Sequence, residues 1–299
     1  MIAARSGRTD ITNILLEGKH VNLDIQEENG DTAVIIAVKT REPDTLRELV
    51  RAGSDLNLQN NEGLTPLMIA AWRGTTADIT KILLEGEHIN LDIQEKRTGW
   101  SALHFSAERG DSATTEALLK AGANPHLKDK NGDTAVIMAV KRHEPATLRE
   151  LVRAGSDLNL QNQEGLTPLM IAARSGRTDI TNILLEGEHI NLDIQEKRTG
   201  QSALHFSAEE GDSATTEALL KAGANPHLKD KYALRYQRQL KSERDDLGGD
   251  DTSSSLTRLK LKELELVSEG KVPTAGQQSQ IKMKMTPEMD PEHSPDFNL

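Results

Sequence analysis

The chain has 299 residues, a net charge of −11 and no cysteine. The absence of cysteine excludes disulfides and cysteine-ligated metals. The negative charge argues against nucleic acid as the main ligand, because neutralising phosphates requires a basic face. Aromatic residues make up only 2% of the chain, so the core must be built from Leu, Ile, Val and Ala.

No segment of the chain is typical of a membrane span. The longest apolar run, Ala33 to Val38, is far too short to cross a bilayer, and we expect no membrane insertion. No basic segment followed by a hydrophobic run opens the chain. We therefore expect an intracellular protein in the cytoplasm, with the nucleus as the alternative.

The first 18 residues match residues 170–187 letter for letter. The chain therefore begins inside a unit whose complete copy lies further along. We expect residues 1–28 to be a truncated N-terminal unit that exposes an apolar face, whereas terminal repeats normally carry polar caps. Our hypothesis is that the natural protein continues in the N-terminal direction.

A glycine-led motif recurs along the first 230 or so residues. Residues 63–71 and 165–173 share the sequence Gly-Leu-Thr-Pro-Leu-Met-Ile-Ala-Ala, and weaker copies begin at the other leading glycines. These glycines are at positions 30, 63, 99, 132, 165 and 200, which are 33, 36, 33, 33 and 35 residues apart. A period of that size is typical of a stack of small supersecondary units.

Each unit predicts a turn followed by two helices. Gly63 suits a turn that needs positive φ, Thr65 is a good helix N-cap, and Pro66 fits the first helical position. A second helix is predicted from apolar residues at i, i+3 and i+4 spacing, such as Ile79, Ile82 and Leu83. In four units this helix should end at a glycine: Gly53, Gly122, Gly155 and Gly223.

This pattern resembles the ankyrin repeat, in which a turn ending in Gly-x-Thr-Pro-Leu-His precedes two antiparallel helices closed by Leu-Leu-x-x-Gly-Ala, with a projecting finger loop. The resemblance covers residues 1 to about 231. It implies an all-α solenoid with six full repeats in residues 29–231. It also implies protein binding without catalysis, and a hydrogen-bonding role between neighbouring repeats for His104 and His205.

The departures from the family pattern are informative. The units that begin at Gly30 and Gly132 lack the mid-repeat glycine and carry Arg-Glu-Pro at 41–43 and His-Glu-Pro at 143–145 instead. The units that begin at Gly63 and Gly165 end in long linkers. We therefore expect the fingers that carry Lys96-Arg97 and Lys197-Arg198 to project further than the others.

The six full repeats form two near-identical triplets, residues 29–130 and 131–231. The positions that differ between the triplets fall just after the first helix or on the fingertip, which the resemblance places on the concave groove. Free drift of exposed positions after duplication would explain them equally well. The candidate partner-binding residues are Lys39, Thr40, Trp72, Arg73, Trp100, Arg109, Arg142, Arg174, Gln201 and Glu210.

Tryptophan and arginine are enriched among binding hot spots, so the favoured patch is Trp72, Arg73, Trp100 and Arg109. The alternative is that Trp100 packs on the aliphatic stems of Lys96 and Arg97.

No pattern in the sequence indicates catalysis, a cofactor or a metal. The histidines recur at the repeat period, which explains them without a ligand role, and no nucleotide-binding glycine motif or nucleophile elbow is present. We therefore predict no enzyme activity, no cofactor and no small-molecule substrate.

The repeat pattern ends after Lys231. Residues 232–247 predict a capping helix with Tyr232, Tyr236 and Leu240 on one face. Residues 248–299 predict a mostly disordered tail with a short helix at 256–267.

These features predict a protein-interaction scaffold or adaptor that holds an unidentified partner protein or peptide in its concave groove. Two alternatives stay open. One is a regulatory or substrate-receptor subunit of a larger enzyme complex, such as a ubiquitin-ligase adaptor. The other is the repeat fragment of a longer multidomain protein.

Overall fold

The computed structural model describes residues 1–18, 21–74, 77–231 and 233–234. The chain divides into two compact units, Met1–Ala224 and Asn225–Leu299, and the helices named below lie in the first. The first four helix pairs are α1 (Ile2–Arg5) with α2 (Thr9–Leu16), α3 (Ala33–Thr40) with α4 (Pro43–Arg51), α5 (Pro66–Arg73) with α6 (Ala77–Leu84), and α7 (Ala102–Arg109) with α8 (Ser112–Lys120). The next three are α9 (Ala135–Arg142) with α10 (Pro145–Arg153), α11 (Pro168–Arg174) with α12 (Thr178–Leu185), and α13 (Ala203–Glu209) with α14 (Ser213–Lys221).

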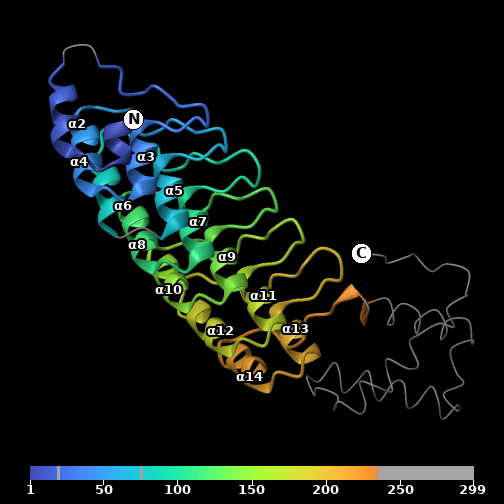
Figure 1. Cartoon of the computed structure of the whole chain (residues 1–299). Helices are drawn as coiled ribbons and strands as arrows, with labels where there is room; N and C mark the ends of the chain where they lie inside the picture. Colours follow the sequence, from blue (N-terminus) through green and yellow to red (C-terminus); the bar gives the residue numbers. More distant parts are fainter. Residues whose placement is uncertain (19–20, 75–76, 232, 235–299) are drawn as a thin grey trace, which may run out of the picture. The chain divides into compact units, whose positions relative to one another are not determined.

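The helix pairs stack side by side in two rows. The odd-numbered helices, which are the first of each pair, contact one another in chain order from α1 to α13, and the even-numbered helices do the same from α2 to α14 (Figure 1). The loops between successive pairs project from the row of first helices as fingers (Figure 1). The all-α stack of repeats predicted from the sequence is therefore confirmed.

The first helices begin as the sequence predicts. The hydroxyl of Thr65 accepts a hydrogen bond from the backbone N–H of Met68 at 3.3 Å, and Pro66 occupies the first turn. Thr167 and Pro168 repeat the arrangement before α11. Such a cap satisfies one of the N–H groups that the start of a helix leaves without a partner.

The glycines predicted to end the second helices all have positive φ, from +73° at Gly155 to +97° at Gly223. A left-handed residue also ends several first helices, where it is glycine at Gly74 and Gly110. Arg41 and His143 occupy the same place after α3 and α9 with a φ of 60°. Residues with a Cβ are strained in this left-handed region. These two repeats therefore form the same turn as the repeats that have glycine there, but at a cost in backbone strain.

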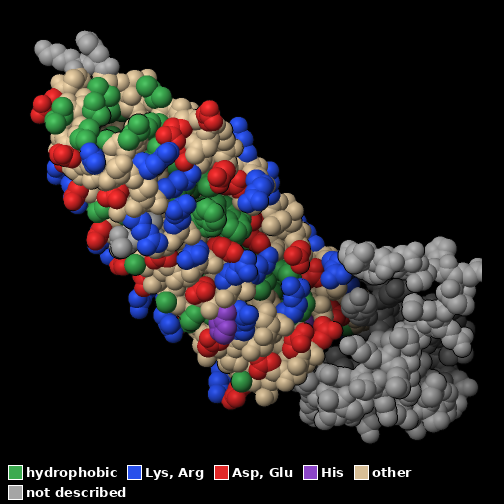
Figure 2. Space-filling view, in the orientation of Figure 1, with side chains coloured by type: hydrophobic (Ala, Val, Ile, Leu, Met, Phe, Trp, Pro, Cys, Tyr) green, Lys and Arg blue, Asp and Glu red, His purple; other side chains and the backbone are tan. Residues whose placement is uncertain are grey.

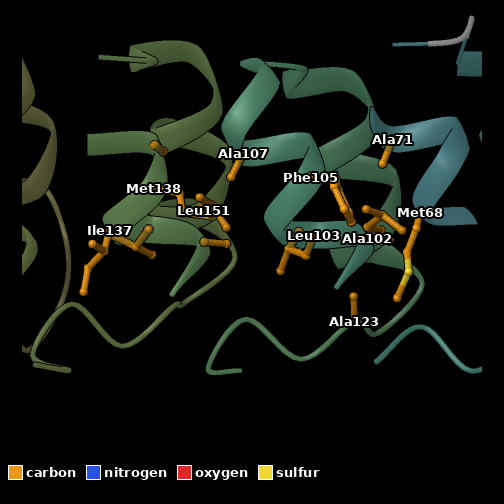
Figure 3. Packing of buried hydrophobic residues seen from close by; sticks show 14 of the residues in the cluster. Met68, Ala71, Ala102, Leu103, Phe105, Ala107, Ala123, Ile137, Met138 and Leu151 are labelled. Carbon is orange, nitrogen blue, oxygen red and sulfur yellow. The ribbon is translucent and has the colours of Figure 1, made fainter. Parts of the chain in front are cut away.

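The core consists of small and aliphatic side chains from neighbouring pairs. Met68 and Ala71 of α5 lie beside Ala102 and Phe105 of α7 (Figure 3). Ile79, Ile82 and Leu83, predicted from their spacing, are at most 3% exposed. Each pair therefore buries its apolar surface against the pairs on either side, and stability accumulates interface by interface.

Buried His104 links two repeats. Its Nδ1 accepts from the backbone N–H of Ser101 at 3.1 Å, and its Nε2–H donates to the carbonyl oxygen of Asp133 at 3.2 Å. A carbonyl can only accept, so this arrangement requires the neutral ring with its proton on Nε2. Burial lowers the pKa of His104, although the contact with Asp133 opposes that shift. The hydrogen-bonding role predicted for this histidine is confirmed.

The N-terminal end of the stack exposes apolar side chains (Figure 2). Ile14 and Leu15 are 67% and 52% exposed, whereas their counterparts in the identical segment 170–187, Ile183 and Leu184, are 2% and 0% exposed. The second segment lies against the preceding pair, α9 and α10, which buries these positions. The exposed apolar face predicted for residues 1–28 is therefore present.

Some predictions lie outside the described residues. The capping helix at 232–247 and the tail at 248–299 fall there, apart from Ala233 and Leu234. Among the helices that the structure describes, none combines the length and apolar character needed to cross a membrane.

Candidate partner-binding face

The finger loops and the carboxyl ends of the first helices form one surface, which we call the finger face. Two pockets lie on it. The smaller, about 330 Å³, is lined by Trp100, Glu108, Asp129, Asn131, Asp133, Met138, Lys141 and Arg142. The larger, about 900 Å³, is lined by Lys128, residues 159–166, Arg174, residues 196–198 and Phe206. Each pocket therefore combines residues from fingers with residues from the row of first helices.

The ten candidate residues occupy two kinds of position. Seven lie in the last turn of a first helix: Lys39, Thr40, Trp72, Arg73, Arg109, Arg142 and Arg174. Glu210 is the C-cap of α13, and Trp100 and Gln201 each follow the leading glycine of a unit. The structure brings Trp100 and Arg142 together in the smaller pocket, and Arg174 lines the larger one.

Lys39 is held in an ion pair. Its ammonium group lies 2.6 Å from the carboxylate of Asp31, which is buried and also accepts from the side chain of Asn60 at 2.9 Å. Lys141 and Asp133 repeat the pair at 2.6 Å in the second triplet. Because each carboxylate is buried, removing its lysine would leave a buried negative charge without a partner. The positive charge of each lysine is in turn already compensated by that carboxylate.

Two candidate arginines contact the preceding repeat. The guanidinium of Arg73 donates to the carbonyl oxygen of Lys39 at 3.0 Å. Arg142 Nε donates to a carboxylate oxygen of Glu108 at 2.7 Å. These contacts span 34 residues and tie neighbouring first helices together, so both side chains contribute to stacking.

Three further candidates also contact other residues of the stack. Thr40 donates its hydroxyl to the carbonyl oxygen of Ile36 at 2.9 Å, and the guanidinium of Arg109 lies against Gly74. The side-chain amide of Gln201 donates to Glu209 at 3.0 Å.

Trp100 is half-buried at its fingertip. Its indole N–H donates to Asp129 at 3.1 Å, and its ring meets Phe105 edge-on with the ring centroids 5.2 Å apart. Edge-to-face pairs of this kind stabilise by about 0.5–1.5 kcal/mol beyond the area they bury. Trp100 therefore holds its finger against α7 and the next finger, and it still lines the smaller pocket.

Trp72 and Arg174 differ from the other candidates. They occupy equivalent positions in the two triplets, at the ends of α5 and α11. Trp72 is 46% exposed, and Arg174 is also exposed. Within the described part of the chain, neither side chain has a hydrogen-bond or ion-pair partner. Both are thus available to another molecule.

A buried carboxylate shapes each of the two longer fingers. Glu95 accepts from the backbone N–H of Arg97 at 2.7 Å and from the hydroxyl of Thr98. Burial alone would raise the pKa of Glu95, but these hydrogen bonds outweigh it and the pKa is lowered. Glu196 has the same contacts and the same direction of shift. Both carboxylates are therefore ionised, and each is held by hydrogen bonds within its own finger loop.

Residues that hold the finger face together were missed in the sequence. Asp31 and Asp133 each precede a paired lysine by eight residues, and this repeated spacing was the available signal. Glu108, which pairs with Arg142, carried no such signal. Across the described ranges, no group of three His, Asp or Glu side chains is arranged to hold a metal ion.

One protein family matches this chain in three overlapping segments. The family is described as "Ankyrin repeats (3 copies)", and the matched residues are 1–93, 70–152 and 136–230. An ankyrin repeat domain from Acinetobacter baumannii AYE is 28% identical, with a TM-score of 0.57 over 62% of this chain and 95% of that one. The ankyrin repeat domain of Bcl-3 is 22% identical, with a TM-score of 0.65 over 74% of this chain and 96% of that one, a likeness of fold.

Relatives in sequence are much longer proteins. Human transient receptor potential cation channel subfamily A member 1 is 31% identical over 41% of this chain and 11% of its own length. The putative E3 ubiquitin-protein ligase XBAT35 of Arabidopsis thaliana is 38% identical over 27% of this chain and 17% of its own. The matched segments thus span less than a fifth of either relative.

Proposed function

The chain belongs to the ankyrin repeat family, and we propose on that premise that it is a non-catalytic scaffold or adaptor, cytoplasmic, which holds a partner protein or peptide against its finger face. Ankyrin repeats are in general protein-interaction modules, but the fold alone does not identify the partner. The observation that carries the proposal is Trp72, a large side chain that is 46% exposed on this face with no polar partner among the described residues.

The opposite side of the stack supports the choice of face. The second helices carry exposed charges that are paired within each helix, such as Asp44 with Arg47 at 3.0 Å and Glu116 with Lys120. Such pairs are typical of a solvated surface. The finger face instead offers a tryptophan and an unpaired arginine, the residue types enriched in hot spots.

A pull-down with two matched variants tests the proposal. Trp72→Ala removes the exposed side chain on the finger face, and Leu220→Ala removes one that is 42% exposed on the second helix α14. Partners captured from source-cell lysate are identified by mass spectrometry, and the affinity of each purified partner is then measured by calorimetry.

We expect Trp72→Ala to weaken binding by about 2 kcal/mol or more, which is roughly 30-fold in Kd, while Leu220→Ala leaves it unchanged. Equal affinities for the wild type and Trp72→Ala would refute Trp72 as a partner contact, which is the observation that carries the proposal.

The likeness to XBAT35 supports a second candidate, a substrate-receptor or regulatory subunit of a larger enzyme complex such as a ubiquitin ligase. In that case the repeats would bind a substrate and another region would engage the enzyme. Removing residues 248–299 separates the two candidates. A self-contained scaffold keeps all its partners, whereas a bipartite adaptor whose tail engages the enzyme loses one set. The repeat part of a longer multidomain protein is the remaining alternative.

A further inference from the structure

The larger pocket on the finger face is basic, although the whole chain has a net charge of −11. It lies between two fingers and the end of α11, where Figure 2 shows Lys and Arg side chains along the finger-loop edge. Its lining contains four cationic side chains and two carboxylates. The cationic residues are Lys128, Arg174, Lys197 and Arg198.

The two carboxylates compensate only part of this charge, because four cations line the pocket and Glu196 interacts electrostatically with one of them, Arg198. Glu196 is 4% exposed, and its oxygens accept from Thr199 and the backbone N–H of Arg198, so its carboxylate is largely engaged within its own loop. Lys128 donates to the carbonyl oxygen of Gln161 at 2.8 Å and so keeps its charge uncompensated. Arg174 has no ion-pair partner among the described residues. Only Glu164 presents an exposed carboxylate to the pocket.

The lining also offers apolar surface and amides. Leu166 and Phe206 are buried at 3% and 8% exposure and line the pocket from beneath. Asn159 and Gln163 add side-chain amides that can donate or accept hydrogen bonds. A ligand that fits therefore carries negative charge beside a small apolar group.

The first triplet shows which features are particular to this pocket. Its equivalent finger carries the same Lys96-Arg97 pair, and Phe105 takes the place of Phe206. However, Trp72 stands where the second triplet has Arg174. At the finger one repeat further toward the N-terminus, Gln26 occupies the position that corresponds to Lys128. Two near-identical halves thus differ by two cations at one site.

We propose that this pocket binds an acidic peptide segment of a partner protein, with Asp or Glu side chains flanking one leucine-like residue. This rests on the proposed function and adds the chemistry of the partner. The carboxylates pair with Arg174 and Arg198, bidentately where the geometry allows, and the apolar residue contacts Phe206. Trp72 provides a separate, apolar contact in the first triplet.

The test uses the full chain and a fluorescein-labelled peptide, Gly-Glu-Asp-Leu-Asp-Glu-Gly, in fluorescence-polarisation titrations. Its control is the amide analogue Gly-Gln-Asn-Leu-Asn-Gln-Gly. The variants are Arg174→Glu, Arg198→Glu, Arg174→Trp, which reproduces the first triplet, and Trp72→Ala. All three positions are exposed, and circular dichroism with thermal melts verifies that each of the four variants is folded.

We expect binding of the acidic peptide only, weakened about tenfold by Arg174→Glu or Arg198→Glu and weakened further as salt rises. Equal binding of the amide analogue, or no effect of Arg174→Glu, overturns the proposal. So does a single-stranded RNA oligonucleotide that binds with the same dependence on Arg174 and displaces the peptide.

The two proposals fail separately. If the natural partner depends on Trp72 while the acidic peptide does not depend on Arg174, the scaffold function stands and the basic pocket is refuted. If the peptide depends on Arg174 but no partner depends on Trp72, the Trp72 contact is refuted.

Discussion

The duplicated segment offers a direct test of how the stack is stabilised. Ile14 and Ile183 lie in identical 18-residue sequences and in equivalent helices, α2 and α12. The two side chains differ in burial: Ile14 is 67% exposed, whereas Ile183 is 2% exposed. The same substitution at both positions therefore separates the effect of packing between repeats from the effect of local sequence.

The expected magnitudes follow from these exposures. Ile183→Ala leaves a cavity beside α10 and should destabilise by roughly 2–5 kcal/mol. Ile14→Ala removes a side chain of which only a third is buried, and alanine's better helix propensity offsets part of the loss. Its net effect should be roughly 0.5 kcal/mol or less.

Urea unfolding followed by circular dichroism measures both variants. Repeat arrays can depart from two-state behaviour, so the complete curves are fitted with nearest-neighbour interface terms. A cost for Ile14→Ala as large as that for Ile183→Ala would refute the reasoning. A second arm places residues 131–169 directly before Met1, which supplies the missing cover, and Ile14→Ala should then become as costly as Ile183→Ala.

Other predictions concern strain and pH. Arg41→Gly should stabilise the chain by about 1 kcal/mol in urea unfolding, because glycine adopts the left-handed turn without strain; a destabilisation would mean that the side chain makes a needed contact. Because burial lowers the pKa of His104, the unfolded state binds the proton more tightly, so stability should fall as pH drops below about 6.5. His104→Gln should flatten that slope between pH 8 and 5, whereas hydrogen-bonded carboxylates such as Glu95 lose their contribution only below about pH 4.5. An unchanged slope in His104→Gln would assign the pH dependence to other groups.

The sequence predicts the architecture well because its signals are local. The Thr-Pro starts, the glycine ends and the apolar spacing of α6 each act within a few residues, and all are found in the structure. The resemblance to a repeat family then predicts that the helix pairs stack side by side. Arg41 and His143 are the informative exceptions, since stacking imposes a left-handed turn that their own sequence does not favour.

The candidate site is less predictable, because its contacts join residues more than thirty positions apart. The sequence predicts that Lys39, Arg73 and Arg142 lie near the ends of first helices. Whether each side chain already has a partner within the stack depends on how far one first helix is offset from the next. The same holds for Trp100, whose partner Asp129 belongs to the next finger. Sequence alone therefore locates the face but does not separate Trp72 and Arg174 from residues already engaged.

Photo-crosslinking tests the central claim most directly. A p-benzoylphenylalanine replaces Trp72 in one chain and Leu220 in another, and each chain is irradiated with a purified partner. A partner held on the finger face should crosslink at position 72 and not at position 220. Crosslinks at 220 alone would place the partner on the second helices and contradict the account.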